Sequence, residues 1–103
     1  MVKDMKYEIK EQQLIIYLQG EINSSTADSV ERDIDLHLQG QEIKSVVLDM
    51  AELVYMSSAG IRIVMKLKQR YDDLSLNNVP NGVYEVLHMV GITNFIKTNK
   101  LEK

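Results

Sequence analysis

Short apolar runs alternate with segments of helical periodicity, and this alternation constrains the fold more than any other feature of the sequence. The expected strands are residues 7–10, 14–20, 45–50, 74–79 and 95–98, and the expected helices are about residues 25–38, 59–71 and 80–90. Because a helix between two strands returns the chain across the sheet, the strands on either side of it become parallel. The sequence therefore predicts one α/β domain with a mixed, mostly parallel sheet and helices packed against it, in the order β-β-α-β-α-β-α-β.

The first half of the chain carries recognisable local signals. The polar residues 11–13 separate the first two strands and predict a turn. In EINSSTAD, Ser25 and Asp28 have the spacing of a capping box, in which a hydroxyl and a carboxylate bind free amides at a helix N-terminus. Gly40 is predicted to end this helix. The run SVVLDM, residues 45–50, is typical of a strand that is buried on both faces.

Charge and composition exclude several classes of function. The chain has 103 residues and is expected to form a single domain over residues 1–103. Its 12 basic and 15 acidic residues give a net charge of −3, so we do not expect it to bind nucleic acid. No apolar run approaches the roughly 18 residues that span a bilayer, and the start, MVKDMKYEIK, does not resemble a signal peptide. We therefore expect a cytoplasmic protein without direct membrane insertion.

The sequence also predicts neither a metal site nor a catalytic serine. The chain has no cysteine, and its two histidines, His37 and His88, lie on separate predicted helices without ligand spacing. Neither a phosphate-binding glycine loop nor the G-x-S-x-G motif of serine hydrolases is present. A hydrolase that uses Ser58 would need one of these histidines as its base, and their positions do not favour that role. We therefore expect a protein that is not an enzyme.

Two serines stand where the third predicted strand gives way to the second helix, in LVYMSSAGIRIVM, residues 53–65. Such a pair can serve as a helix cap, a nucleophile or an acceptor for a phosphoryl group. As an N-cap, Ser57 would accept a hydrogen bond from a backbone amide, which stabilises a helix by about 1 kcal/mol. Ser58 would then be the first helical residue, with its hydroxyl facing water. This structural role alone would explain both serines.

A second polar loop is expected beside these serines. In open α/β sheets, binding residues gather beyond the carboxyl ends of the strands. The loops that follow the second and third strands meet at this edge if the two strands are neighbours. Asp49 would belong to the supporting polar loop, or would only bond the backbone after it as an Asx turn. The predicted polar patch consists of Asn23, Ser24, Asp49, Ser57 and Ser58.

A serine in the first turn of a helix is suited to carry a phosphate. Unpaired amides and the helix dipole favour negative charge there, and a phosphate adds roughly −1.5 to −2 charges. The folded domain would tolerate this charge, but a partner docked over Ile61 and Met65 would meet a strongly hydrated dianion. Phosphorylation of Ser58 is therefore expected to have little effect on the domain and a large effect on a complex.

Three segments of the chain carry a resemblance to a known family. The most specific is SVVLDMAELVYMSSAGIRIVM, in which a buried strand ends in Asp and a short apolar loop leads to Ser-Ser and Gly. LIIYLQGEINSSTAD and VYEVLHMVGITNFIK are less specific. With these segments, nearly the whole chain resembles the STAS domain, and more narrowly the stand-alone anti-sigma factor antagonists of bacteria. The resemblance implies a STAS-like fold and a regulatory protein that is neither an enzyme nor dependent on a cofactor.

The resemblance also implies a partner-switching pathway. An anti-sigma factor that is also a serine kinase would bind the unmodified chain, and this capture would free a sigma factor for transcription. Phosphorylation of Ser58 would separate the complex, and a serine phosphatase would reset the system. The surface facing the partner would include the loop after the second strand and the start of the second helix. Its implied residues are Asn23, Ser24, Ser57, Ala59, Gly60, Ile61 and Met65.

Two departures from the family pattern leave alternatives open. Many antagonists have an acidic residue directly before the acceptor, but here Ser57 occupies that position and is an alternative acceptor. The chain also stops soon after residues 95–97, without the extra C-terminal helix of many relatives, so part of the sheet edge or a helix face is expected to be more open. STAS domains also act as scaffolds and as accessory subunits of membrane transporters. A STAS scaffold without a phosphorylation switch is therefore the alternative function.

Overall fold

One five-stranded sheet organises the structure, a computed structural model that describes residues 5–102. Its strands lie in chain order: β1 (Lys6–Lys10), β2 (Gln13–Ile22), β3 (Ser45–Met56), β4 (Asp73–Val79) and β5 (Lys97–Lys100). β1 and β2 are antiparallel, whereas β2 to β5 are parallel. The remaining elements are α1 (Ala27–Leu38), α2 (Ser58–Arg70), α3 (Asn81–Met89) and the 3-10 helix η1 (Ile92–Asn94). The predicted fold class and element order are confirmed.

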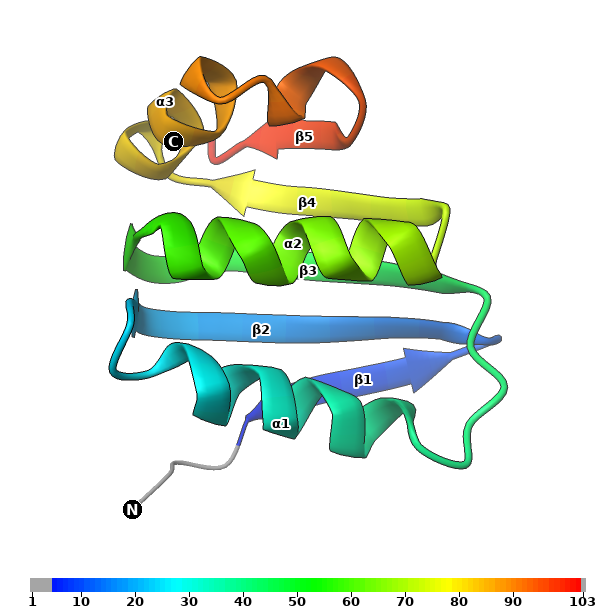
Figure 1. Cartoon of the computed structure of the whole chain (residues 1–103). Coiled ribbons are helices and arrows are strands. Elements are labelled where there is room, and N and C mark those ends of the chain that lie inside the picture. The colour runs from blue at the N-terminus through cyan, green and yellow to red at the C-terminus, as the bar shows by residue number, and fades with distance from the viewer. Residues whose placement is uncertain (1–4, 103) are drawn as a thin grey trace.

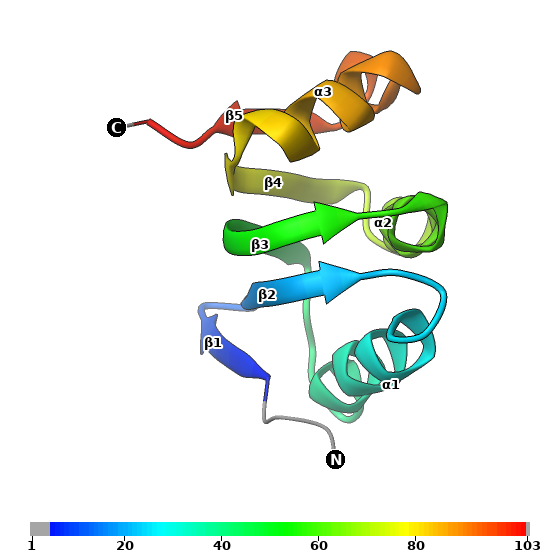
Figure 2. The same ribbon diagram turned by 90° about the vertical axis from the view of Figure 1, so that its left-hand side faces the viewer.

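The helices cover one face of the sheet. Figure 1 shows α1 and α2 side by side in front of β2 and β3, with α3 close to β4 and β5. Strand residues that point to the helices, such as Ile16, Leu48 and Leu76, are completely buried and share one core with Ile34 of α1 and Leu87 of α3. Figure 2 shows that, over the described residues, no helix covers the opposite face of the sheet.

β3 is consequently not buried on both faces as predicted. Leu48 and Met50 point to the helices and are completely buried. Ser45 and Asp49 lie on the other face and are partly exposed, so the prediction is wrong for these two residues, although Val47 between them is buried. Their polar side chains fit an open face, because water satisfies them there.

The start of α1 also differs from the prediction. Ser25 and Asp28 do not form a capping box; Asn23 and Thr26 form a reciprocal pair of bonds instead. Asn23 N donates to Thr26 Oγ1 at 2.9 Å, and Thr26 N donates to Asn23 Oδ1 at 3.2 Å. Asn23 Oδ1 also accepts a bond from Ser25 N at 2.8 Å, which completes an Asx turn. These bonds rigidify the loop between β2 and α1.

Three strands have boundaries that differ from the prediction by two residues or more. β2 continues past Gly20 to Ile22. β3 continues to Met56, where it still pairs with Ile22 of β2, and two register shifts interrupt this pairing. In the sequence, Ala51 and the charged Glu52 follow the apolar run of residues 46–50, so the strand was predicted to end there. β5 begins at Lys97 rather than residue 95, because η1 precedes it.

Candidate functional site

The junction between β3 and α2 is held by Ser57. Its hydroxyl oxygen accepts a hydrogen bond from Ala59 N at 3.2 Å, and Ser57 is the N-cap of α2. Ser57 N donates to the carbonyl oxygen of Ile22 at 2.9 Å, which ties the helix start to the end of β2. The capping role of Ser57 is therefore confirmed, and its hydroxyl is already engaged within the domain.

Ser58 is the first residue of α2 and is exposed to solvent. Among residues 5–102, no partner forms a hydrogen bond with its side chain at this position. The hydroxyl therefore faces water, as predicted, and is open to approach by another molecule.

The loop after β2 lies beside these serines because of the strand pairing. Ile22 and Met56 are opposite each other in the parallel ladder, so the segments that follow them leave the sheet at the same edge. Figure 1 shows α1 and α2 beginning side by side at this edge. Asn23 is partly buried and held by the bonds of its turn, whereas Ser24 is exposed. The predicted meeting of the two loops is therefore found in the structure.

A shallow hollow of about 440 Å³ lies between the two loops. Five of its lining residues belong to the predicted site: Asn23, Ser24, Ser57, Ser58 and Ala59. Four others were missed by the sequence analysis: Ala27, Asp28, Tyr55 and Arg62. Arg62 has a sequence signal, since residues four positions apart share a helix face with Ser58. Tyr55 has none, because its position depends on the unexpected extension of β3.

The three remaining residues predicted on α2 have different surroundings. Gly60 is buried, and a Cβ atom at this position would lie 2.5 Å from Met56 Cγ and 3.0 Å from Ile22 Cγ2. Ile61 is partly buried and packs against the core. Met65 is 44% exposed. Met65 is therefore the most exposed of the three, while Gly60 allows α2 to approach the ends of β2 and β3.

Asp49 does not belong to this group. It lies within β3 rather than in a loop, on the face away from the helices, and it does not line the hollow. Its Oδ1 accepts the Asx-type bond from Ala51 N at 3.0 Å that the sequence suggested. Its Oδ2 accepts a bond from Asn78 Nδ2 at 2.8 Å. The prediction of a polar patch that includes Asp49 is therefore wrong.

The hollow combines hydroxyl groups with one cation and one anion. Arg62 and Asp28 supply the charges, and Tyr55 is half exposed at its margin. Neither histidine lines it: the His37 ring stacks on Tyr7 at a centroid distance of 3.9 Å. This arrangement provides an exposed hydroxyl on an accessible surface, and no imidazole that could act as a base lines the hollow.

Two features are absent from residues 5–102. No group of three or more histidine, cysteine, aspartate or glutamate side chains is placed to hold a metal ion. None of the helices combines the length and the apolar character that crossing a bilayer requires.

Similarity to known proteins extends over most of the chain. The STAS domain family profile matches residues 4–103. BtrV of Bordetella bronchiseptica, which is named as an anti-sigma factor antagonist, is 37% identical over 82 residues, covering 76% of this chain and 70% of BtrV. The anti-sigma F factor antagonist of Paenibacillus polymyxa is 26% identical over 83 residues, covering 77% of this chain and 71% of that protein.

The fold is also similar to that of the anti-sigma factor antagonist SpoIIAA. The unphosphorylated form of SpoIIAA gives a TM-score of 0.76 at 16% identity, covering 91% of this chain and 86% of SpoIIAA. The phosphorylated form of SpoIIAA from Bacillus gives a TM-score of 0.67 at 17% identity, covering 91% of this chain and 89% of SpoIIAA. At this level of identity, the likeness shows the fold alone.

Proposed function

This chain belongs to the STAS domain family, and we propose that it acts as an anti-sigma factor antagonist in a bacterial partner-switching pathway. Two relatives that carry this name support the proposal, and one of them is 37% identical. The observation that carries the proposal is the exposed Ser58 at the start of α2, beside a hollow that another molecule can reach. In this role the chain is a binding partner and a phosphorylation substrate rather than an enzyme.

The proposed cycle has two states. Unmodified, the chain binds an anti-sigma factor that is also a serine kinase, and this binding frees a sigma factor. The kinase then transfers the terminal phosphoryl group of ATP to the Ser58 oxygen; the bond to ADP breaks, and the serine proton passes to the kinase. The phosphorylated chain leaves, and a serine phosphatase restores the hydroxyl. Because ATP is the donor, we place this cycle in the cytoplasm.

Ser58 is favoured over Ser57 as the acceptor by their hydrogen bonds. The Ser57 oxygen accepts a bond from Ala59 N, so its modification would remove the cap of α2. Loss of such a cap costs about 1 kcal/mol. Ser58 is exposed and its modification disrupts no bond of this kind. Ser57 remains the alternative acceptor, but its phosphorylation would remove the helix cap, whereas phosphorylation of Ser58 would not.

The partner surface is proposed around the hollow and the outer side of α2. Asn23 and Ser24 supply one wall, Ala59 lies at the helix start, and the exposed Met65 supplies an adaptable apolar contact. A phosphate on Ser58 brings roughly −1.5 to −2 charges to the middle of this surface. A partner that covered it would have to strip its hydration, so the complex separates.

Phosphorylation with defined variants tests the proposal. The wild-type chain, Ser58→Ala and Ser57→Ala are incubated with ATP and the cognate kinase-like anti-sigma factor, and their intact masses are measured. We expect one added phosphate on the wild type and on Ser57→Ala, and none on Ser58→Ala. A wild-type chain that gains no phosphate contradicts the switch. If the unphosphorylated wild-type chain still binds the anti-sigma factor, the result supports the alternative function, a STAS scaffold without a phosphorylation switch.

A further inference from the structure

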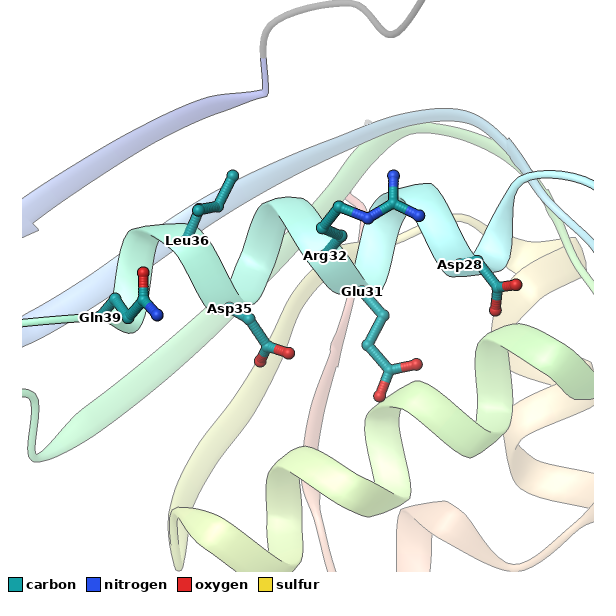
Figure 3. A pocket seen from close by; sticks show the side chains of 6 residues that line it. All are labelled: Asp28, Glu31, Arg32, Asp35, Leu36 and Gln39. Carbon is teal, nitrogen blue, oxygen red and sulfur yellow. The ribbon is translucent and has the colours of Figure 1, made fainter.

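Basic residues of α2 face acidic residues of α1. Lys66 Nζ lies 2.9 Å from Glu31 Oε2, and Arg70 Nη1 lies 2.9 Å from Asp35 Oδ1. Figure 3 shows both of these carboxylates pointing from α1 toward α2. The basic residues follow one another at intervals of four along α2, so they form a stripe, which begins with Arg62. Two of its three cations are thus neutralised within the domain.

Arg62, at the start of this stripe, is in a different situation. Among residues 5–102, no ion pair joins its guanidinium to a carboxylate. Asp28 is the charged residue of α1 that lines the same hollow, and neither a hydrogen bond nor an ion pair within residues 5–102 joins it to Arg62. Arg62 is exposed, so its side chain is free to change its direction without repacking the core. The hollow therefore contains a cation that the fold itself does not use.

Ser58 precedes Arg62 by four residues on the same helix. Side chains at this spacing lie on one face of a helix, with Cβ atoms about 5–6 Å apart. An arginine side chain is long enough to bridge this distance, and its planar guanidinium binds two phosphate oxygens at once. Both residues line the hollow, so the guanidinium of Arg62 is within reach of a phosphate on Ser58 by side-chain rotation alone.

We propose that Arg62 is the internal counter-ion of phosphorylated Ser58 and holds the phosphate within the hollow. This inference rests on the function proposed above, because it requires the phosphate. Asp28 lines the other side of the hollow and repels the phosphate, which favours the contact with Arg62. In the unmodified chain Arg62 is available to a carboxylate of a partner. Phosphorylation therefore alters two charged groups of the partner surface at once: it adds an anion and withdraws a cation.

The test uses the full chain with phosphoserine installed at position 58 during translation, so that no kinase is needed. Phosphorus NMR follows the second ionisation of the phosphate, whose ordinary pKa is about 6. A nearby guanidinium stabilises the dianion and lowers this pKa. We expect Arg62→Gln to raise the pKa by at least about 0.5 pH unit, and Asp28→Asn to lower it. Arg62→Lys keeps the charge without the paired bonds and is expected to fall between the wild type and Arg62→Gln.

Arg70→Gln is the matched control, because it removes the same charge from the same stripe, about three helical turns away from Ser58. Its titration should coincide with that of the wild type at physiological salt. The proposal is overturned if Arg62→Gln titrates like the wild type, or if both glutamine variants shift equally. Since the phosphate is installed without a kinase, the titration is independent of the proposed cycle. A titration that shows no effect of Arg62 would overturn the counter-ion proposal but not phosphorylation by the kinase. A kinase assay without added phosphate would overturn the proposed cycle but not the result of the titration.

Discussion

At the scale of single residues, two adjacent serines differ in what their oxygens do. The Ser57 oxygen accepts a bond from a backbone amide, whereas the Ser58 oxygen faces solvent. Both roles could be predicted, because a serine pair directly before a periodic apolar segment indicates a helix start. Arg62 carried a sequence signal that was not used, its spacing of four residues from Ser58 on the same helix. Tyr55 could not be assigned to the site from the sequence, since its presence in the hollow depends on the extension of β3.

Replacing the two serines in turn separates these roles. Ser57→Ala removes the cap and should lower the free energy of unfolding by about 1 kcal/mol. Ser58→Ala should change it by less than about 0.5 kcal/mol, because the side chain is exposed. Urea unfolding of both variants measures the difference. Equal losses for the two would contradict the assignment of the cap.

Gly60 is required by close packing. A Cβ atom there would lie 2.5 Å from Met56 Cγ and 3.0 Å from Ile22 Cγ2. Overpacking of this kind costs about 1–3 kcal/mol, which outweighs the better helix propensity of alanine. Gly60→Ala should therefore be destabilising by about 1 kcal/mol or more in thermal or urea unfolding.

Gly82 provides the control for Gly60. It lies in the first turn of α3, and a Cβ atom there would meet no other atom within 4 Å. Gly82→Ala should therefore raise the free energy of unfolding, by about 0.5–1 kcal/mol. Destabilisation of the same size at both glycines would refute the packing explanation.

At the scale of secondary structure, the sequence predicted the existence of the elements better than their ends. The helices were found because their apolar positions recur regularly, but Asn23 and Thr26 displaced the expected cap at Ser25. The pair Asn23 and Thr26 and the pair Ser25 and Asp28 are each three residues apart. The sequence spacing therefore does not tell which pair caps the helix, which depends on where β2 ends. The β3 boundary was missed because the register shifts break the alternation of side chains between the two faces.

The β1–β2 turn makes a further prediction at this scale. Glu11 and Gln12 have φ values of 52° and 68°, so both lie in the left-handed region. A two-residue turn of this type favours glycine at its second position. Gln12→Gly should raise the free energy of unfolding by about 0.5–1 kcal/mol. Gln13→Gly, within β2, should lower the free energy of unfolding instead. If urea unfolding shows a change of the same sign for both variants, the left-handed conformation of the turn does not explain the effect of Gln12→Gly.

At the scale of the whole molecule, the site lies on the surface of a core that does not depend on it. The α/β order was predictable because a helical segment follows each of the second, third and fourth strands, and right-handed crossovers allow few topologies. The open face of the sheet was not anticipated for β3, where Ser45 and Asp49 mark it. The hollow lies at the edge where β2 and β3 end, so its charge can change while the core is unaffected.

The phosphorylated chain should therefore keep its stability. A negative group in the first turn of a helix is favourable by about 0.3–1 kcal/mol at low salt. Phosphoserine at position 58 should leave the free energy of unfolding unchanged or raise it by no more than this amount. Urea unfolding of the modified and unmodified chains provides the comparison, and a loss greater than about 1 kcal/mol would show that the phosphate acts by disrupting the domain.

Calorimetric titration of the anti-sigma factor with the two forms of the chain tests the central claim most directly. The chain with phosphoserine at position 58 should bind at least about 100-fold more weakly than the unmodified chain, a difference of about 2.7 kcal/mol. Since the modified domain remains folded, this loss would come from the surface around Ser58. Equal affinity of the two forms would contradict the account.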